Sequence, residues 1–324
     1  MKNDMNRPIQ RILRLSSHAD PRQIEPRDLP SPACRGGRPV VSVVLAGGQG
    51  SRLAPLTMEQ AKPAVAFAPQ HRIIDFALSN LVNSGLDGIH VLVQHNARSI
   101  KDHLQLAWQP VARNGFVNVV QPRAHAFKGT ADAVRQSLGV LAIAPDSLVL
   151  VFGADHIYRM DVNQMIDFHL ARKADVTVAA LPVARADARA FGVIECERDG
   201  RIASFLEKPD DPPAMPGAPD MALASMGNYI FSGACLLRAL CEPIGRDEPD
   251  FGHHVLPRLL HEGAKVYAYD FASNCVPGVQ PYERPAYWRD VGTIDAYFNS
   301  SLDTLGPQPT FDVANPQWPI PMPA

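Results

Sequence analysis

Hydrophobic residues follow two alternating patterns along most of the chain: short β-branched runs and longer stretches with helical spacing. The first strong run covers residues 40–46, where Val, Leu and Ala follow one another almost without interruption. Such a run is typical of a strand that is buried on both faces of a parallel sheet. Further strands are predicted over residues 88–94, 116–121, 147–152 and 175–182, and helices over residues 74–84, 97–106, 130–141 and 162–173. This alternation predicts an α/β fold with a doubly wound, mostly parallel sheet.

The pattern changes near residue 190, where two short strands follow each other without a helix between them. Residues 192–196 and 202–205 predict an antiparallel hairpin with a turn at Asp199-Gly200. The elements predicted beyond it are a proline-rich loop over residues 210–219, strands over 226–231 and 266–271, and helices over 255–261 and 294–302. We therefore expect antiparallel additions to the sheet.

The two ends of the chain differ from this ordered region. Residues 1–38 are polar and rich in Arg and Pro, which indicates a flexible leader with at most one short amphipathic helix over residues 9–15. Residues 307–324 contain repeated prolines, and we expect an irregular tail that packs little or packs irregularly. A single domain is thus expected over residues 39–306.

The composition excludes several classes of protein. Of the 324 residues, 46 % are hydrophobic and 20 % are charged, so extensive disorder is excluded. A net charge of −2 argues against nucleic-acid binding driven by overall charge. No apolar run is long enough to cross a membrane and no signal peptide is visible, so we expect a cytoplasmic protein. The five cysteines form no Cys-x-x-Cys pair, as is typical of reduced thiols.

A glycine-rich segment follows the first predicted strand directly. Gly47, Gly48 and Gly50 leave backbone N–H groups uncovered, as a loop that wraps a phosphate requires. Neither the P-loop nor the dinucleotide-binding spacing is present. The glycines could serve only a tight turn, but Arg52 and Lys62 nearby favour a polyphosphate ligand over that structural role.

Two aspartates stand where predicted strands end. Asp155 follows a buried strand, and taken alone it is equally well explained as a Mg²⁺ ligand or as the N-cap of the next helix. Asp290 occupies a similar position far along the chain, and the two together would suit a hard cation. Lys208 follows another strand and is held by Pro209, so it could bind a second phosphate or simply be solvated.

Together these segments resemble the bacterial ADP-glucose pyrophosphorylases (glucose-1-phosphate adenylyltransferases), a branch of the sugar-1-phosphate nucleotidylyltransferase family, from about residue 40 to residue 318. The glycine-rich segment alone marks the broad superfamily, whereas the stretches over 72–80 and 287–293 are more specific to this branch. The matching motifs are Leu-Ala-Gly-Gly-Gln-Gly-Ser-Arg-Leu over 45–53, Ala-Lys-Pro-Ala over 61–64, Arg-Ile-Ile-Asp-Phe-Ala-Leu-Ser-Asn over 72–80, Gly-Thr-Ala-Asp-Ala over 129–133, Asp-His-Ile-Tyr over 155–158, Glu-Lys-Pro over 207–209, Ser-Met-Gly over 225–227 and Tyr-Trp-Arg-Asp-Val-Gly-Thr over 287–293.

The resemblance implies transfer of AMP from ATP to glucose 1-phosphate, giving ADP-glucose for a glycogen-type polymer. It implies that the residues with catalytic roles are Arg52, Lys62 and Asp155. The residues implied to bind the nucleotide are Leu45, Ala46, Gly47, Gly48, Gly50, Gln94, Gly129 and Asp132, with Gln94 on the adenine. Those implied to bind the sugar phosphate are Glu207, Lys208, Ser225 and Asp290. Asp155 and Asp290 would share Mg²⁺.

Several positions depart from the family pattern. Gln49 stands where the family usually has Arg, Ala154 replaces a Gly, and Ala126-Phe127-Lys128 replaces an aromatic-Tyr-Arg sequence. Glu59 occupies the place of a Lys that often serves the allosteric activator. The family's left-handed β-helix does not follow residue 320, so we expect a catalytic domain alone, insensitive to glycolytic intermediates.

Two alternatives therefore stay open. One is a catalytically weak paralogue that binds a nucleotide sugar and regulates a partner chain. The other is a sister enzyme that uses a different nucleotide or sugar phosphate. An apolar surface left uncovered where the β-helix would dock also favours a homo-oligomer or pairing with a full-length homologue.

Overall fold

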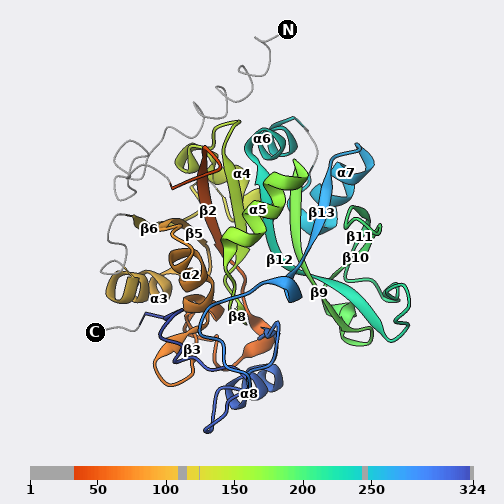
Figure 1. Cartoon of the computed structure of the whole chain (residues 1–324). Helices are drawn as coiled ribbons and strands as arrows, with labels where there is room; N and C mark the ends of the chain where they lie inside the picture. The colour runs from red at the N-terminus through yellow and green to blue at the C-terminus, as the bar shows by residue number, and fades with distance from the viewer. Residues whose placement is uncertain (1–32, 109–114, 124, 243–246, 322–324) are drawn as a thin grey trace.

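A computed structural model describes residues 33–108, 115–123, 125–242 and 247–321. A ten-stranded sheet runs through the molecule and carries helices on both faces (Figure 1). The predicted α/β class is confirmed, and the sheet is mixed, with a parallel part and an antiparallel part that share strand β7.

The parallel part contains four adjacent strands in the order β7-β2-β5-β6. Their bounds are Arg38–Ala46 for β2, Gly88–Val93 for β5, Phe116–Val120 for β6 and Leu148–Gly153 for β7. The helices along this part are α2 (Ile73–Asn83), α3 (Ala97–His103), α4 (Thr130–Leu141) and α5 (Val162–Arg172). These elements confirm the predicted ones to within a few residues, and a short π-helical segment, Leu104–Trp108, extends α3.

Strand β2 is buried on both faces, as its β-branched run predicts. Val40 and Val44 belong to the core cluster beneath α2, α3 and α5, whereas Val41 and Val43 belong to the cluster beneath α4, α6 and α7. Because successive side chains of a strand point to opposite faces, a nearly continuous apolar run supplies both layers at once.

The antiparallel part is centred on one long strand, β12 (Met221–Ser232), which pairs with β7, β9 and β10. The strands that complete it are β9 (Val176–Ala184), β10 (Gly192–Cys196) and β11 (Ile202–Glu207), and β13 (Val266–Asp270) pairs with β9 in parallel. The predicted hairpin is confirmed as β10 and β11. The first residues of β12 were not predicted, because Ala222 and Ala224 have little strand preference and become a strand through pairing with β9 and β10.

Helix α6 (Gly233–Cys241) was also not predicted, because it begins directly after β12 without a loop to mark a boundary. The remaining helices, α7 (Leu256–His261) and α8 (Ile294–Leu302), confirm predicted ones. Three small strand pairs were not predicted, although a strand end was expected at Asp290: β1 (Cys34–Arg35) with β2, β3 (Ala66–Phe67) with β4 (His71–Arg72), and β8 (His156–Tyr158) with β14 (Trp288–Asp290).

Both ends of the described chain pack against the domain. Residues 34–38 form a hairpin with the start of β2, and the short helix expected over residues 9–15 lies outside the described residues. The tail after residue 306 has no helix or strand, yet Phe311 and Trp318 are buried. Phe311 stacks on Tyr287 at 4.7 Å between ring centroids, so the tail packs on the domain in an irregular conformation.

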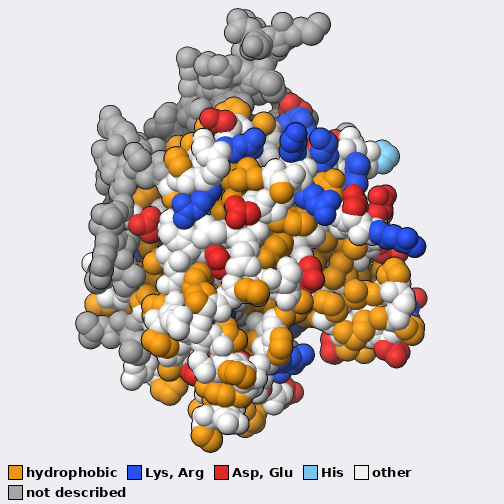
Figure 2. Space-filling model, in the orientation of Figure 1, with side chains coloured by type: hydrophobic (Ala, Val, Ile, Leu, Met, Phe, Trp, Pro, Cys, Tyr) orange, Lys and Arg blue, Asp and Glu red, His pale blue; other side chains and the backbone are white. Residues whose placement is uncertain are grey.

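The surface is uneven in character. Figure 2 shows charged side chains of both signs over the upper part of the molecule and apolar side chains toward the bottom, where α8 lies in Figure 1. The exposed apolar residues in and after α8 are Ile294, Phe298, Leu302 and Leu305. In the described part of the chain, no helix is both long and apolar enough to span a bilayer.

Candidate active site

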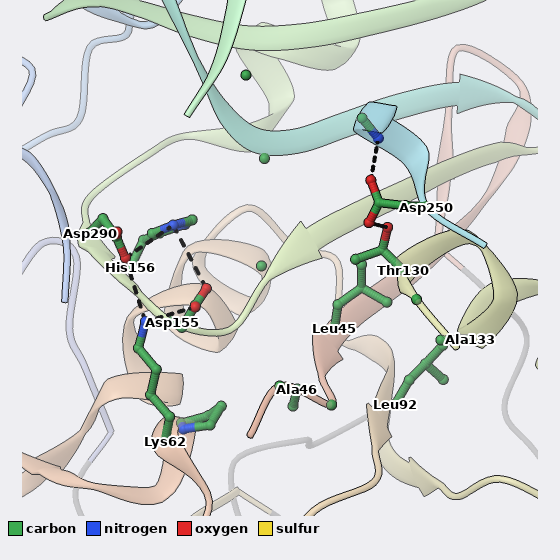
Figure 3. A pocket seen from close by; sticks show the side chains of 18 of the residues that line it. Leu45, Ala46, Lys62, Leu92, Thr130, Ala133, Asp155, His156, Asp250 and Asp290 are labelled. Atoms are coloured by element: carbon green, nitrogen blue, oxygen red, sulfur yellow. Dashed lines mark hydrogen bonds and ion pairs between the residues drawn. The ribbon is translucent and has the colours of Figure 1, made fainter. Parts of the chain in front are cut away.

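A cavity of about 630 Å³ opens at the carboxyl ends of strands β2, β5 and β7 (Figure 3). Open α/β sheets bind ligands at this edge. Most of the predicted site residues line it: Leu45, Ala46, Gly47, Gly48, Arg52, Lys62, Gln94, Gly129, Asp155, Glu207, Lys208, Ser225 and Asp290. Gly50 and Asp132 are absent from the lining.

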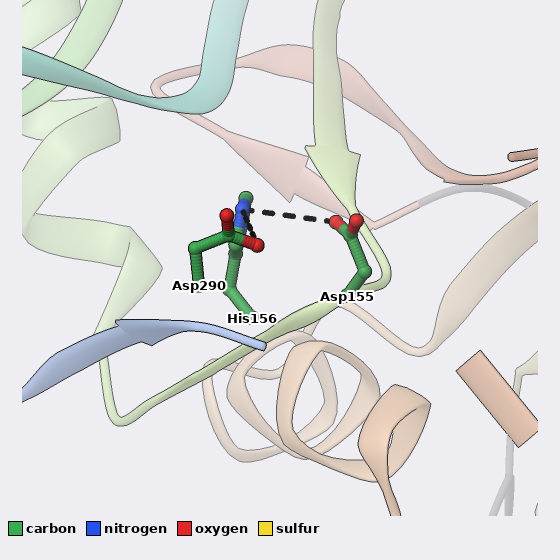
Figure 4. A group of neighbouring side chains, drawn as sticks. All are labelled: Asp155, His156 and Asp290. Atoms are coloured by element: carbon green, nitrogen blue, oxygen red, sulfur yellow. Dashed lines mark ion pairs between the residues drawn. The ribbon is translucent and has the colours of Figure 1, made fainter. Parts of the chain in front are cut away.

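One end of the cavity is acidic. Asp155 comes just before β8, Asp290 ends β14, and the antiparallel pairing of these strands places Asp290 opposite His156. One ligand atom from each of Asp155, His156 and Asp290 lies within 4.8 Å of the others (Figure 4). The two aspartates that are far apart in sequence therefore meet at one point, as their positions at strand ends led us to expect.

Lys62 lies between the two carboxylates. Its Nζ is 2.9 Å from Asp155 Oδ2 and 3.5 Å from Asp290 Oδ1, and only 9 % of its side chain is exposed. Burial alone would lower the pKa of Lys62, but the two carboxylates outweigh it and the pKa is raised. Conversely, burial would raise the pKa of Asp155, whereas Lys62 and His156 hold it well below its ordinary value.

The donor set of this cluster suits a divalent metal ion. Two carboxylates provide oxygen ligands, and Nε2 of His156 lies 3.7 Å from Asp155 Oδ1 and 3.9 Å from Asp290 Oδ1. The alternative that Asp155 caps the next helix is wrong, because the side chain of Asp161 caps α5 and accepts a 3.0 Å hydrogen bond from the Asn163 N–H. Asp155 is thus free of a capping role and faces the cavity (Figure 3).

Gly50 shapes the loop without contacting the cavity. Its φ is +65°, and a Cβ at this position would lie 2.7 Å from Cβ of Lys62. Only glycine allows the loop to pass so close to the base of the lysine side chain. Arg52, two residues on, is exposed at the cavity and forms no ion pair with the described residues.

The opposite end of the cavity is held by backbone hydrogen bonds. The carboxamide of Gln94 donates to the Phe127 carbonyl at 3.3 Å and accepts a short hydrogen bond from the Phe127 N–H. Gln94 therefore lines the cavity while its amide group is paired with the loop that carries Phe127 and Lys128. An adenine contact by this amide, as the resemblance implies, would have to replace or share this pairing.

Asp132 lies outside the cavity lining. Its side chain is buried and accepts hydrogen bonds from the Lys128 N–H at 2.9 Å and from Gln136 Nε2 at 2.7 Å, and it pairs with Arg135. Burial would raise the pKa of Asp132, but these partners lower it overall. Asp132 thus stabilises the first turn of α4 and the preceding loop, and the nucleotide contact that the resemblance implies stays a prediction.

Strands of the antiparallel part of the sheet form a further side of the cavity. Lys208 Nζ lies 3.2 Å from Glu207 Oε1, and φ of Lys208 is +48°. The Glu207 carboxylate packs so tightly that a Cβ on Gly252 would lie 2.3 Å from its Oε2. Ser225, on β12, is buried beside these residues at the cavity wall.

Comparison with known proteins places the chain in a family. The model of a family described as nucleotidyl transferase matches residues 41–306. The chain belongs to this nucleotidyl transferase family. Its similarity to curated relatives extends over most of its length. It is 51 % identical over 287 residues to the glucose-1-phosphate adenylyltransferase of Thermodesulfovibrio yellowstonii, which covers 87 % of this chain and 70 % of the relative.

Two further relatives with the same name are similar over comparable lengths. The Thermus thermophilus protein is 47 % identical over 295 residues, and the Deinococcus radiodurans protein is 44 % identical over 294 residues. Each alignment covers 87 % of this nucleotidyl transferase and 70 % of the relative. The resemblance that the motifs indicated is therefore confirmed.

The structure of this nucleotidyl transferase adds residues that the sequence analysis did not assign to the site. Among them are Phe127, Lys128, Thr130, His156, Phe191, Tyr229 and Asp250. Asp250 accepts hydrogen bonds from Thr130 Oγ1 at 2.9 Å and the Gly252 N–H at 2.8 Å, which ties α4 to the cavity wall (Figure 3). His156 could have been found, since it adjoins Asp155 in a recognised motif; Phe191 and Tyr229 carry no such signal.

Proposed function

We propose that this nucleotidyl transferase transfers the adenylyl group of ATP to glucose 1-phosphate, releasing pyrophosphate and forming ADP-glucose. Two kinds of observation support this. Relatives that are 44–51 % identical over most of the chain are named glucose-1-phosphate adenylyltransferase. The residues at the cavity also offer cations and backbone N–H groups for the phosphates of both substrates.

In this proposal the triphosphate lies over Gly47 and Gly48, with Arg52 and Lys62 neutralising its charge. The adenine lies toward Gln94 and Gly129. The phosphate of the sugar binds Lys208 on the opposite wall, and Glu207 and Ser225 accept or donate hydrogen bonds to the glucose hydroxyls. The two substrates then enter from different walls and meet at the acidic end, beside Asp290.

Asp155 and Asp290 would hold a Mg²⁺ ion, which when bound would neutralise charge on the α-phosphate and the sugar phosphate. An oxygen of the sugar phosphate attacks the α-phosphorus, and the bond to the pyrophosphate leaving group breaks. The chain needs no general base, because a phosphate monoester is already an anion at neutral pH. Its residues bring two mutually repelling anions together and hold them in line.

The single observation that carries the proposal is the meeting of Asp155 and Asp290 with Lys62 at the cavity. The Lys62 Nζ contacts both carboxylates, at 2.9 and 3.5 Å, although Asp290 is 228 residues away in sequence. Such a cluster of paired acids and a cation beside a glycine-rich loop suits phosphoryl chemistry better than it suits a purely structural ion pair.

Pyrophosphate release by the purified chain tests the proposal. Each of ATP, GTP, CTP, UTP and dTTP is offered with glucose 1-phosphate and Mg²⁺, and ATP is expected to give the fastest release. Faster release with another nucleotide would instead support the sister enzyme. Binding of ADP-glucose without pyrophosphate release from any nucleotide would support the catalytically weak paralogue.

We also infer that glycolytic intermediates change the rate little, because Glu59 offers an exposed carboxylate where an anionic activator would need a cation. A large rate increase in an activator titration would contradict this. Pairing with a second copy or a longer homologue, and a cytoplasmic location, stay predictions; sedimentation velocity of the chain alone and mixed with such a homologue tests the pairing.

A further inference from the structure

The place of Lys62 at the acidic end has a consequence for how the site fills. Its ammonium lies 2.9 Å from one carboxylate and 3.5 Å from the other. His156 Nε2 is farther from both, at 3.7 and 3.9 Å. Lys62 is thus the nearest cation to each acid of the pair, in the position that an ion shared by Asp155 and Asp290 would need.

Two cations cannot share this position. Oxygen ligands lie roughly 2.1 Å from a bound Mg²⁺, so an ammonium within hydrogen-bond distance of the same oxygens competes for both the space and the lone pairs. An ammonium also repels a divalent cation strongly at such short range. In the protein without ligands, the Lys62 ammonium therefore balances the charge of the two carboxylates.

The base of the Lys62 side chain is held by the chain around it. Gly50 packs against Cβ of Lys62, and Lys62 begins a short helical turn, Lys62–Ala64, preceded by Ala61, whose N–H donates a 3.1 Å hydrogen bond to Ser99 Oγ. Lys62 lines the same cavity as Gly47 and Gly48. An anion on those glycines would attract it away from the carboxylates.

We propose that Lys62 is a resident counter-ion that occupies the cation position between Asp155 and Asp290 until nucleotide phosphates draw its ammonium away. Binding of the nucleotide and binding of the divalent ion are then positively coupled, because the first removes a competitor of the second. The acid pair stays charge-compensated in the empty protein and takes up the ion together with the nucleotide. The inference rests on the proposed function for the identity of the anion.

The test measures Mn²⁺ binding to the nucleotide-free protein from the loss of the free Mn²⁺ signal in electron paramagnetic resonance. Lys62→Met removes the ammonium and keeps an unbranched side chain, so Mn²⁺ should bind at least about tenfold more tightly than to the wild type. Lys62→Arg keeps the charge and should bind Mn²⁺ as weakly as the wild type.

Lys128→Met is the matched control. It makes the same substitution at another lysine that lines the cavity, but Lys128 pairs with Asp247 at 3.2 Å and not with the acid pair. Its Mn²⁺ affinity should stay within about twofold of the wild type. Equal tightening in both variants would show a general charge effect and would overturn the proposal.

The folding of the variants is checked separately. Without metal, Lys62→Met should melt at a lower temperature than the wild type, because its two carboxylates lose their counter-ion. Added Mn²⁺ should raise the melting temperature of Lys62→Met by more than it raises that of the wild type. Lys62→Gln serves as a second neutral variant if the Met variant does not fold. Unchanged Mn²⁺ affinity in a folded neutral variant would overturn the proposal, whereas the proposed function fails only if the wild type makes no ADP-glucose.

Discussion

The two ends of the cavity are built by different means. The acidic end joins Lys62, Asp155 and Asp290 through side-chain charges from segments that are distant in sequence. The other end joins the Gln94 side chain to the backbone of Phe127, which is 33 residues away, and the Asp132 side chain to the Lys128 N–H, four residues away. One end thus depends on charges between distant segments, and the other on hydrogen bonds between side chains and the backbone of one loop.

This difference bears on where the chain departs from its family. Asp155, Asp290 and Lys62 all match the family pattern, and only Ala154, next to Asp155, departs from it there, whereas the departures at Gln49 and at Phe127-Lys128 line the cavity where we propose that the nucleotide binds. We therefore expect the chain to retain the chemistry at the acidic end. We expect it to differ from its family in the affinity for the nucleotide and in the choice of nucleotide.

The largest effect should come from the acidic end itself. Asp155→Asn and Asp290→Asn each remove one charge from the pair, and pyrophosphate release should fall about a thousandfold, since a metal clamp contributes several kcal/mol to the transition state. Initial rates at saturating substrates measure the loss. Asp146→Asn, at an exposed position outside the cavity lining, is the control and should be unaffected. Full activity in either site variant would contradict the assignment of the metal ligands.

The next effect should come from the support of strand β14. Asp303 accepts hydrogen bonds from Tyr287 OH at 2.9 Å and from Arg289 Nε at 3.0 Å, and these hold the strand that carries Asp290. Asp303→Ala should lower kcat about tenfold to a hundredfold, as is typical when the support of a metal ligand is lost.

Mn²⁺ affinity measured in the presence of nucleotide should fall in parallel in Asp303→Ala, which a loss of stability alone would not produce. Asp295→Ala, at an exposed position in α8, the helix that Asp303 follows, is the matched control. If kcat falls while Mn²⁺ affinity is unchanged, Asp303 does not act through Asp290.

A third effect is a loss of stability in acid that comes from buried histidines and not from the acidic end of the cavity. Burial lowers the pKa of His90 and of His169 from 6.5 to about 4. The unfolded chain takes up protons below pH 6.5 while the folded chain keeps these imidazoles neutral, so acidification from pH 7 to pH 5 should cost about 1–2 kcal/mol for each. Asp155, whose pKa is lowered, contributes stability that is lost only below the ordinary carboxyl range.

Urea unfolding at pH 7 and pH 5 measures the acid effect. His90→Gln keeps a polar group beside Asn118, which lies 3.4 Å from Nδ1 of His90, and removes one titrating group. The loss of unfolding free energy between the two pH values should then shrink by about the contribution of one imidazole, ~1–2 kcal/mol. An unchanged loss would show that His90 is not responsible.

The smallest effect should come from restoring the family residue at the nucleotide end. Gln49→Arg adds a cation at the cavity, and KM for ATP should fall about threefold to tenfold, since a hydrogen bond to a charged group contributes roughly 1 kcal/mol. Gln105→Arg, an exposed position away from the cavity, is the control. A lower KM in both variants would indicate a general effect of charge.

Much of the fold was predictable because buried positions show as hydrophobic patterns among neighbouring residues. The run over residues 40–46 and the helical spacing over residues 130–141 correspond to β2 and α4 in the structure. Pattern analysis missed α6 and the first half of β12, where no loop marks a boundary and where alanines pair as a strand only because β9 and β10 lie beside them.

The sequence predicted which residues form the candidate site better than it predicted which of them contact one another. The position of Asp155 and Asp290 at strand ends led to the expectation that they meet, and most of the residues that the family resemblance assigned to the site line the cavity. Neither could show that Lys62 lies between the acids, or that Asp132 points inward to its own helix. These outcomes depend on packing between segments, which local pattern does not record.

By itself, the sequence determined the alternation of strands and helices, the glycine-rich loop and the family, since each is expressed by neighbouring residues or a short motif. Only the tertiary structure decided the pairing of β8 with β14, and with it the meeting of Asp290 and His156. A three-residue strand has too few side chains to form a recognisable hydrophobic pattern. Its register is set by pairing with a strand that is distant in the sequence.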